Sequence, residues 1–176
     1  DHLLAILEKE AIKHSLDAIQ THPTTTKTRI LGQGQQLIRL DFEQAFEPVD
    51  VADLLGRAAE LINDTRALVL SDYAKGVLQD VVPLIALGKT HNVPVIVDPK
   101  GTDFYRYRGA TLITPNLSEF EAVVGHCQNE DELVRKGLQL VSDLQLEAML
   151  ITRGEHGMTL IRPDSPELHL PARAQE

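Results

Sequence analysis

The stretch Pro94-Val-Ile-Val-Asp98 decides the fold class, because it is an unbroken apolar run of strand length that ends in a carboxylate. The stretch Ala67-Leu-Val-Leu-Ser71 has the same form, and a helical pattern over residues 77–91 separates the two. Short apolar runs are typical of strands buried on both faces, and helices between such strands are typical of parallel sheets with right-handed crossovers. The pattern therefore predicts an α/β protein with a parallel sheet.

The same alternation of strands and helices continues outward from this stretch. A helical pattern begins at Val51, and the apolar runs at residues 111–114 and 148–152 predict a third and a fourth strand. Helices are expected near residues 119–124 and 131–143, and an antiparallel edge pair at residues 157–161 and 168–170. Residues 51–176 are therefore predicted to form a doubly wound parallel sheet, the α/β core of the chain.

Residues 25–42 follow a strand pattern of another kind, with glycines at its centre. Two runs, residues 25–31 and 35–42, flank Gly32-Gln-Gly34, and apolar and polar side chains alternate from Leu37 to Phe42. This pattern predicts a β-hairpin with one apolar face. Helical patterns lie on both sides, and residues 16–21 predict a short strand, so we expect residues 21–43 to form a flap that is inserted into another part of the fold.

Composition excludes several classes of protein. The 176 residues include 17 Lys and Arg against 26 Asp and Glu, a net charge of −9, and 43% of them are hydrophobic. No apolar run approaches the roughly 20 residues that span a bilayer, and no basic stretch offers a face for nucleic-acid phosphates, so membrane insertion and nucleic-acid binding are disfavoured. Cys127 is the single cysteine, which excludes an internal disulfide or a cysteine-based zinc cluster and favours the reducing cytoplasm.

The length predicts one domain, truncated at both ends. A chain of 176 residues buries enough surface for one core. It begins at Asp1 inside an amphipathic helical pattern over residues 3–12, and it stops a few residues after the strand pattern at 168–170 without a closing helix. We therefore expect residues 1–176 to be part of a larger protein.

Polar side chains follow every predicted strand at the point where it ends. Ligands of open parallel sheets bind outside the carboxyl ends of the strands, so we expect these side chains to converge on one edge of the sheet. In chain order they are Asp72 and Lys75, then Asp98 and Lys100, then Asn116 and Glu119, and last the segment Thr152-Arg-Gly-Glu-His-Gly157.

Asn116 and Glu119 are spaced for the first turn of a helix, and two interpretations of this spacing stay open. A carboxylate and an amide on one side of a helix start can hold a hydrated Mg²⁺, with Glu119 as a ligand and Asn116 acting through water. The same pair has the form of a capping box, in which Asn116 caps the helix and Glu119 is its reciprocal partner. The two interpretations are compatible.

The lysines and aspartates also have a functional and a structural interpretation each. Lys75 and Lys100 can bind phosphate as point charges, or they can be solvated loop residues. Asp72 and Asp98 can orient sugar hydroxyls, although Asp98, which precedes Pro99, can instead shape a turn. The glycines of residues 152–157 can admit an adenine or a ribose against the backbone, or form a plain turn.

The aromatic side chains near these segments are interpreted as packing residues. They are Tyr73, Phe104, Tyr105 and Tyr107. Arg106, which lies between two of them, is interpreted as part of a solvated face. For Arg106 and the nearby Arg108, contact with an anionic substrate stays open as the less favoured alternative.

Taken together, these passages resemble the ribokinase, or PfkB-type, family of sugar kinases. The resemblance covers about residues 21–176, and within the family it is to the heptose-phosphate kinases in particular. It is carried by six passages in this order: Thr21-His-Pro-Thr-Thr-Thr-Lys27, Gln35-Gln-Leu-Ile-Arg-Leu-Asp41, Ser71-Asp-Tyr-Ala-Lys-Gly76, Asp98-Pro-Lys-Gly-Thr-Asp-Phe104, Tyr107-Arg-Gly-Ala-Thr111 and Thr114-Pro-Asn-Leu-Ser-Glu-Phe-Glu-Ala-Val-Val-Gly125.

The resemblance implies a ribokinase-like fold and an activity. That activity is ATP-dependent phosphorylation of D-glycero-β-D-manno-heptose 7-phosphate at C1, which gives heptose 1,7-bisphosphate for ADP-heptose and lipopolysaccharide core synthesis. Lys75 and Lys100 would attract a phosphate of the donor or of the sugar. The resemblance further implies ATP and Mg²⁺ at Asn116, Leu117, Ser118 and Glu119, and the adenosine side of ATP at Thr152, Gly154 and Gly157.

The resemblance also implies that the hairpin of residues 25–42 is the family's lid, which covers the sugar and pairs two subunits in many members, and it therefore implies a homodimer. Leu37, Leu40 and Phe42 support this expectation, since apolar side chains of this size are costly to leave in water.

One departure from the family concerns catalysis. Family members carry a Gly-Ala-Gly-Asp stretch whose Asp is the catalytic base, and this sequence has no such stretch, so the base is expected beyond Glu176. We therefore predict that the 176-residue chain alone is inactive. Two alternatives stay open: a ribokinase-family kinase for another sugar phosphate, and a non-catalytic ligand-binding or dimerisation module.

Overall fold

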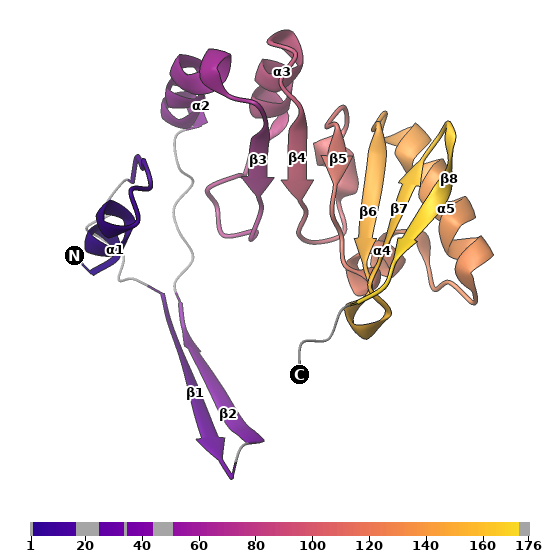
Figure 1. The fold of residues 1–176 in the computed structure, drawn as a ribbon, viewed down its shortest axis with the longest axis horizontal. Helices are drawn as coiled ribbons and strands as arrows, with labels where there is room; N and C mark the ends of the chain where they lie inside the picture. Colours follow the sequence, from indigo (N-terminus) through magenta and orange to yellow (C-terminus); the bar gives the residue numbers. More distant parts are fainter. Residues whose placement is uncertain (1, 17–24, 34, 44–50, 173–176) are drawn as a thin grey trace. The chain divides into compact units, whose positions relative to one another are not determined.

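The computed structural model describes residues 2–16, 25–33, 35–43 and 51–172. The chain folds as two compact units, Asp1–Ala45 and Phe46–Glu176. Each unit has its own secondary structure (Figure 1).

The first unit contains the predicted hairpin. Helix α1 (His2–Lys9) comes first, and strands β1 (Thr26–Gly32) and β2 (Gln35–Phe42) then pair antiparallel. The hairpin prediction is confirmed, whereas its role as a lid stays a prediction. Leu16 is not in a strand, and the rest of the strand expected at residues 16–21 lies outside the described residues.

The hairpin exposes one apolar face, as its alternation predicts. Ile30 pairs with Ile38, and Leu40 and Phe42 continue the same face because side chains of a strand alternate with a period of two. Phe42 is 62% exposed, and the other three are exposed as well. Leu37 falls on the opposite face of β2 and is exposed as well.

The second unit is the α/β core. Its helices and strands alternate over most of the chain, with two consecutive helices after the third strand and two consecutive strands at the end. In chain order they are α2 (Val51–Leu61), η1 (Ile62–Asp64), β3 (Leu68–Ser71), α3 (Val82–Thr90), β4 (Val95–Asp98), η2 (Phe104–Tyr107), β5 (Leu112–Ile113), α4 (Leu117–Val124), α5 (Glu130–Asp143), β6 (Ala148–Thr152), η3 (Gly154–His156), β7 (Met158–Arg162) and β8 (Ser165–Leu170).

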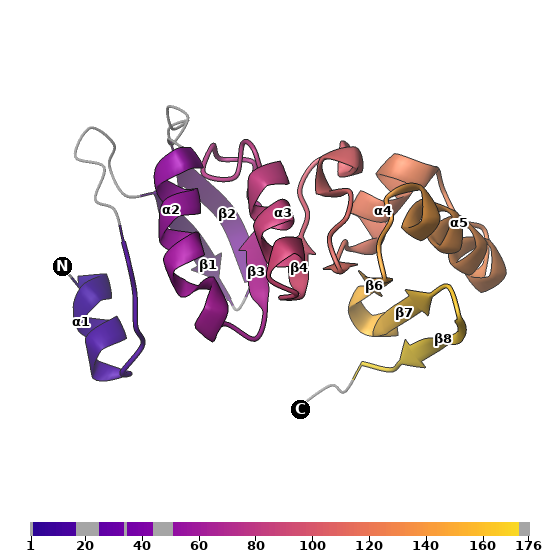
Figure 2. The same ribbon diagram turned by 90° about the horizontal axis from the view of Figure 1, so that it is seen from above.

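These strands form a mixed sheet that confirms the predicted α/β class. The six-stranded sheet has the order β3-β4-β5-β6-β7-β8, with β3 to β6 parallel and β7 and β8 antiparallel at its edge (Figure 1). The order of these strands in the sheet is the same as their order in the chain. Right-handed crossovers between the parallel strands therefore place the connecting helices on one face of the sheet. Seen from above, α3, α4 and α5 lie on the same side of the sheet (Figure 2).

One row of side chains crosses the sheet and forms the centre of the core. Its members are paired neighbour to neighbour on five strands, and all are buried beneath the helices. They are Leu70, Val97, Ile113, Met149 and Ile161.

The opposite face of the sheet is less covered than the sequence predicts. Val69 and Ile96 are neighbours on this face, and Val69 is 63% exposed. Burial of β3 on both faces was expected from its continuous apolar run. The described helices cover one face only, so that expectation is wrong for Val69.

Helix α3 begins five residues later than predicted, at Val82 instead of Val77. Pro83 stands in its first turn, the only part of a helix where a residue without an N–H fits well. The Asp80 carboxylate accepts a hydrogen bond from the Val82 N–H at 3.2 Å and so satisfies a free donor of the helix start. The residues between β3 and α3 are thereby left as a loop.

Two helical glycines predict opposite effects of the same substitution. A Cβ at Gly88 in α3 would lie 2.3 Å from Val95 Cγ2 and 3.0 Å from the Val93 carbonyl, whereas nothing lies within 4 Å of a Cβ at Gly56 in α2. We expect Gly88→Ala to lower the free energy of unfolding by about 1–3 kcal/mol, and Gly56→Ala to raise it by about 0.5–1 kcal/mol. Urea unfolding followed by circular dichroism measures both, and equal effects would contradict this packing of α3 on β4.

Candidate functional site

A cavity of about 300 Å³ lies at the carboxyl ends of the parallel strands. Residues that follow β3, β4, β5 and the end of β6 all contribute to it. The predicted convergence of these segments is therefore confirmed. The lining residues are Asp72, Tyr73, Asp98, Pro99, Lys100, Thr114, Asn116, Glu119 and Thr152.

Backbone hydrogen bonds hold the segments together beyond the ends of the strands. The Asp72 N–H donates to the Asp98 carbonyl at 3.0 Å, which extends the pairing of β3 with β4 by one residue. The Thr152 N–H donates to the Pro115 carbonyl at 2.9 Å, and Asn116 forms an isolated parallel bridge with Thr152. Thr152 thus lies directly beside the start of α4.

Asn116 and Glu119 form a complete capping box at the start of α4. The Asn116 Oδ1 accepts from the Glu119 N–H at 2.9 Å, and the Glu119 Oε2 accepts from the Asn116 N–H at 3.1 Å. The structural interpretation of this pair is confirmed, and it fixes the rotamer of Glu119. The carboxylate is held at the edge of the cavity by the helix that it caps.

Lys100 and Glu119 form an ion pair in this cavity. The Lys100 Nζ donates to the Glu119 Oε1 at 2.7 Å. This hydrogen bond, together with the charge of Glu119, raises the pKa of the Lys100 ammonium. The second Glu119 oxygen is occupied by the helix cap, so a cation that binds this carboxylate must share it with Lys100 or displace Lys100 from it.

Asp72 is buried and fully engaged by its neighbours. Its side chain is 3% exposed, its Oδ1 accepts from the Ala74 N–H at 2.7 Å, and its Oδ2 accepts from the Tyr107 hydroxyl at 2.8 Å. The Tyr107 hydroxyl in turn accepts from the Lys100 N–H at 3.2 Å. Tyr107 therefore connects the loop after β3 to the loop after β4.

Burial raises the pKa of Tyr107 to about 12, because the phenolate would be desolvated and would also face the Asp72 carboxylate. The hydroxyl is thus protonated over the ordinary pH range and remains a donor to Asp72. Both oxygens of Asp72 have protein partners, which supports a structural role for Asp72 beside the predicted contact with sugar hydroxyls.

Arg106 corrects the prediction of a solvated face. Its Nη2 donates to the carbonyls of Leu78 and Gln79, and its Nη1 lies 3.7 Å from the Asp72 Oδ2. The guanidinium therefore ties the loop before α3 to η2. Among the aromatic residues, Phe104 is buried as predicted, whereas Tyr73 and Tyr105 are exposed.

Several predicted site residues lie outside the lining of this cavity. Lys75 is exposed in the loop after β3, and Leu117 and Ser118 belong to the first turn of α4. Gly154 and Gly157 lie in the turn after β6, both with positive φ, and a Cβ at Gly157 would lie 1.9 Å from the Leu170 carbonyl. Glycine is required there, and the predicted contacts of these residues with a nucleotide stay predictions.

Three lining residues were absent from the predicted set: Tyr73, Pro99 and Thr114. All three follow the ends of strands. The rule that ligands bind beyond the carboxyl ends of parallel strands, which identified their neighbours, therefore identifies them too. Tyr107 is different, because it lies 35 residues from Asp72 in sequence and no local pattern joins the two.

The oxygen donors at the cavity suit a magnesium ion. Mg²⁺ keeps several waters and takes one or two protein oxygens, and Glu119 with Asn116 offers such a donor set at one corner. No cluster of three or more His, Cys, Asp and Glu side chains suited to a metal occurs within the described residues. Glu119 therefore suits a hydrated Mg²⁺ that takes its other ligands from water and substrate phosphates, rather than a Mg²⁺ held by protein side chains alone.

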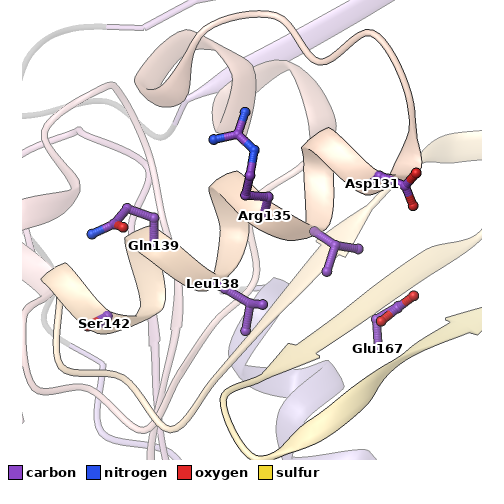
Figure 3. A pocket seen from close by; sticks show the side chains of 7 residues that line it. Asp131, Arg135, Leu138, Gln139, Ser142 and Glu167 are labelled. Atoms are coloured by element: carbon purple, nitrogen blue, oxygen red, sulfur yellow. The ribbon is translucent and has the colours of Figure 1, made fainter.

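A second groove, of about 470 Å³, lies between α5 and β8. Arg135, Leu138 and Gln139 extend from α5, and Glu167 comes from β8 (Figure 3). None of the predicted site residues lines this groove. Within residues 2–16, 25–33, 35–43 and 51–172, no helix is long and apolar enough to span a membrane.

Comparison with known families shows the family of the chain. All of the chain, residues 1–176, matches the pfkB family carbohydrate kinases. The chain belongs to the pfkB family. The resemblance stated from the sequence passages is therefore confirmed.

Curated pfkB relatives give a closer comparison. The chain is 55% identical over 174 residues to the bifunctional protein HldE of Haemophilus influenzae (strain PittEE), a match that covers 99% of the chain and 37% of the relative. The identity to HldE of Yersinia enterocolitica is also 55%, with the same coverage. The chain thus spans 37% of the length of these relatives.

Solved pfkB-type structures confirm the ribokinase-like fold. Ribokinase from Giardia lamblia superposes with a TM-score of 0.78 at 13% identity, covering 99% of this chain and 56% of that one. Phosphofructokinase-2 from Escherichia coli gives a TM-score of 0.74 at 17% identity, covering 99% of this chain and 58% of that one. At these identities the likeness concerns the fold alone.

The Tyr107 hydroxyl predicts a pH-dependent effect on stability. Tyr107→Phe removes a donor to the buried Asp72 carboxylate, so we expect the free energy of unfolding to fall by about 1–2 kcal/mol at pH 8. Tyr105→Phe is the matched control, because Tyr105 is 59% exposed, and its effect should stay within about 0.5 kcal/mol.

The difference between wild type and Tyr107→Phe should shrink as pH rises. The folded pKa of Tyr107 is raised from 10.0 to about 12, so its contribution is complete below pH 10 and is lost as pH rises towards 12. Denaturant unfolding at pH 8, 10 and 11 measures this, and a constant difference would contradict the Tyr107–Asp72 contact.

Proposed function

We propose that this chain is the nucleotide-side part of a sugar kinase that acts on D-glycero-β-D-manno-heptose 7-phosphate. The kinase would transfer the γ-phosphoryl group of ATP to the C1 hydroxyl and give heptose 1,7-bisphosphate, a precursor of ADP-heptose for the lipopolysaccharide core. The single observation that carries the proposal is the cavity that gathers Lys100, Asn116 and Glu119 at the strand ends of a pfkB-family sheet. The 55% identity to HldE supports the heptose-phosphate branch, and ATP as donor favours a cytoplasmic location.

Charge complementarity supports phosphoryl transfer at this cavity. The reaction depends on positioning and on neutralising the phosphate charge more than on covalent chemistry by the protein. Lys100 would exchange its partner Glu119 for a phosphate oxygen, and Lys75 would meet a phosphate from the loop after β3. A bound Mg²⁺ would neutralise charge on the ATP phosphates, with Glu119 and Asn116 holding its hydration shell.

The remaining predicted residues would orient the substrates. Asp98, whose carbonyl accepts from Asp72, would face sugar hydroxyls from the cavity wall. Thr152, Gly154 and Gly157 would bound the adenosine side, and Leu117 and Ser118 would place the first turn of α4 against the phosphates. The base that takes the C1 hydroxyl proton is expected in a Gly-Ala-Gly-Asp stretch, which this sequence does not contain.

The full gene product should phosphorylate heptose 7-phosphate in the presence of ATP and Mg²⁺. We expect a new sugar 1-phosphate signal in phosphorus NMR and coupled release of ADP. Fructose 6-phosphate and ribose serve as competing substrates at equal concentration. A higher kcat/KM for either of them would contradict the heptose substrate, and no turnover with any sugar would favour the non-catalytic module.

Two control arms accompany this assay. Glu119→Gln should lower kcat about 100-fold, because it weakens the anionic ligand of Mg²⁺, whereas Glu147→Gln, an exposed change at the far end of the strands, should leave kcat within about twofold. The 176-residue chain alone should give no turnover, since it lacks the Gly-Ala-Gly-Asp stretch. Turnover by that chain would overturn the assignment of the base.

We also propose a homodimer through the hairpin. Ile30, Ile38, Leu40 and Phe42 form its exposed apolar face, and each such side chain gains about 1.5–3 kcal/mol when it is buried. An interface between two copies would remove this face from water.

The full gene product should therefore sediment as a dimer at micromolar concentration. Leu40→Asp should shift it to a monomer, because it places a charge on the apolar face. Lys27→Gln changes the opposite face and should leave the dimer intact. A monomeric wild type, or a Leu40→Asp variant that stays dimeric, would contradict this interface.

A further inference from the structure

Arg153 follows β6 directly and lies on the side of the sheet that the helices cover. Side chains of a strand alternate, so Met149, Ile151 and Arg153 share one face, and the first two are fully buried. Arg153 continues this buried row, and its side chain is only 15% exposed. Thr152, its neighbour on the other face, lines the cavity.

The guanidinium of Arg153 contacts two other elements. Its Nη1 donates to the Glu130 Oε2 at 2.9 Å and to the Thr159 Oγ1 at 3.1 Å, and its Nη2 forms a second bond to Glu130. Thr159 is fully buried in β7, and its hydroxyl lies 3.0 Å from the Nδ1 of His169 in β8. Arg153 thus joins the start of α5 to the edge of the sheet.

The Arg153–Glu130 pair is partly buried, with the Arg153 side chain 15% and the Glu130 side chain 51% exposed. A two-point guanidinium–carboxylate pair has a fixed geometry, because both groups are planar. The Arg153 Nε is buried without a hydrogen-bond partner among the described residues, so the contacts of the guanidinium are made by its two Nη atoms. Because these contacts hold the guanidinium, they also restrain the backbone of Arg153.

The backbone of Arg153 closes the turn after β6. Its N–H donates to the Gly157 carbonyl at 2.8 Å, and its carbonyl accepts from the His156 N–H at 3.1 Å. Arg153, with its side chain held by Glu130 and Thr159, therefore sets the path of residues 154–157. The same residue follows Thr152, which bridges to Asn116.

We propose that Arg153 is a positioning residue for the nucleotide. Held by Glu130 and Thr159, it fixes the turn of residues 154–157 and the place of Thr152 beside Asn116, and so sets the affinity for ATP without touching ATP. This inference rests on the proposed function, because it takes the turn after β6 as the adenosine side of the site.

The test separates nucleotide binding from sugar binding in the full gene product. Arg153→Met should raise the KM for ATP about tenfold or more, since small displacements of a binding loop weaken binding strongly, and should leave the KM for heptose 7-phosphate within about twofold. Arg153→Lys should fall between, because a lysine keeps the positive charge near Glu130 but cannot form the planar two-point contact with its carboxylate.

Glu130→Gln and Arg135→Met complete the set of variants. Glu130→Gln should reproduce the ATP effect in part, and it carries the test if Arg153→Met does not fold. Arg135 lies on the same helix and pairs with Glu132 with its side chain 71% exposed, so Arg135→Met should leave both KM values within about twofold.

Hydrogen exchange gives a readout that needs no activity. The amides of His156 and Gly157 should exchange about tenfold or more faster in Arg153→Met, while amides of α3 keep the wild-type rate. If the wild type shows no kinase activity, the proposed function fails, and faster exchange confined to this turn still supports the positioning role. Unchanged exchange, or a loss of stability with an unchanged KM for ATP, would overturn it.

Discussion

The paired row Leu70, Val97, Ile113, Met149 and Ile161 is the constraint on which the rest of the structure depends. Each side chain is buried, and a shift of one residue in any strand would turn that strand's apolar side chains away from the helices. The burial of this row therefore sets the register of the sheet. The register in turn decides which residue stands first beyond the end of each strand.

The polar edge follows from that register. Asp72, Asp98, Asn116 and Thr152 come together because their strands end at neighbouring positions and backbone bonds continue the pairing past the ends. The side chains of Asp72 and Asn116 are held in place by protein partners. The capping box orients Glu119 and the Tyr107 hydroxyl orients Asp72, so groups at the cavity are preorganised by bonds that also stabilise the fold.

Sequence reasoning performed best where one residue pattern has one physical cause. Continuous apolar runs predicted β4 and β6, alternation predicted the hairpin, and the spacing of Asn116 and Glu119 predicted a capping box that is present. It failed where distant segments decide the outcome. Arg106 was taken for a solvated residue, yet it binds carbonyls of the loop before α3, and Val69 was taken for a buried residue although its face of β3 is open.

The sequence by itself determined the α/β class, the edge of the sheet that carries the polar residues, and the resemblance to the pfkB kinases, because strand and helix periodicity and short motifs are local properties of a chain. Only the tertiary structure decided which side chains meet at that edge. The Tyr107–Asp72 bond, the Lys100–Glu119 pair and the anchoring of Arg153 by Glu130 join residues 19 to 35 positions apart. Contacts of this kind depend on the packing of whole elements, which no local pattern encodes.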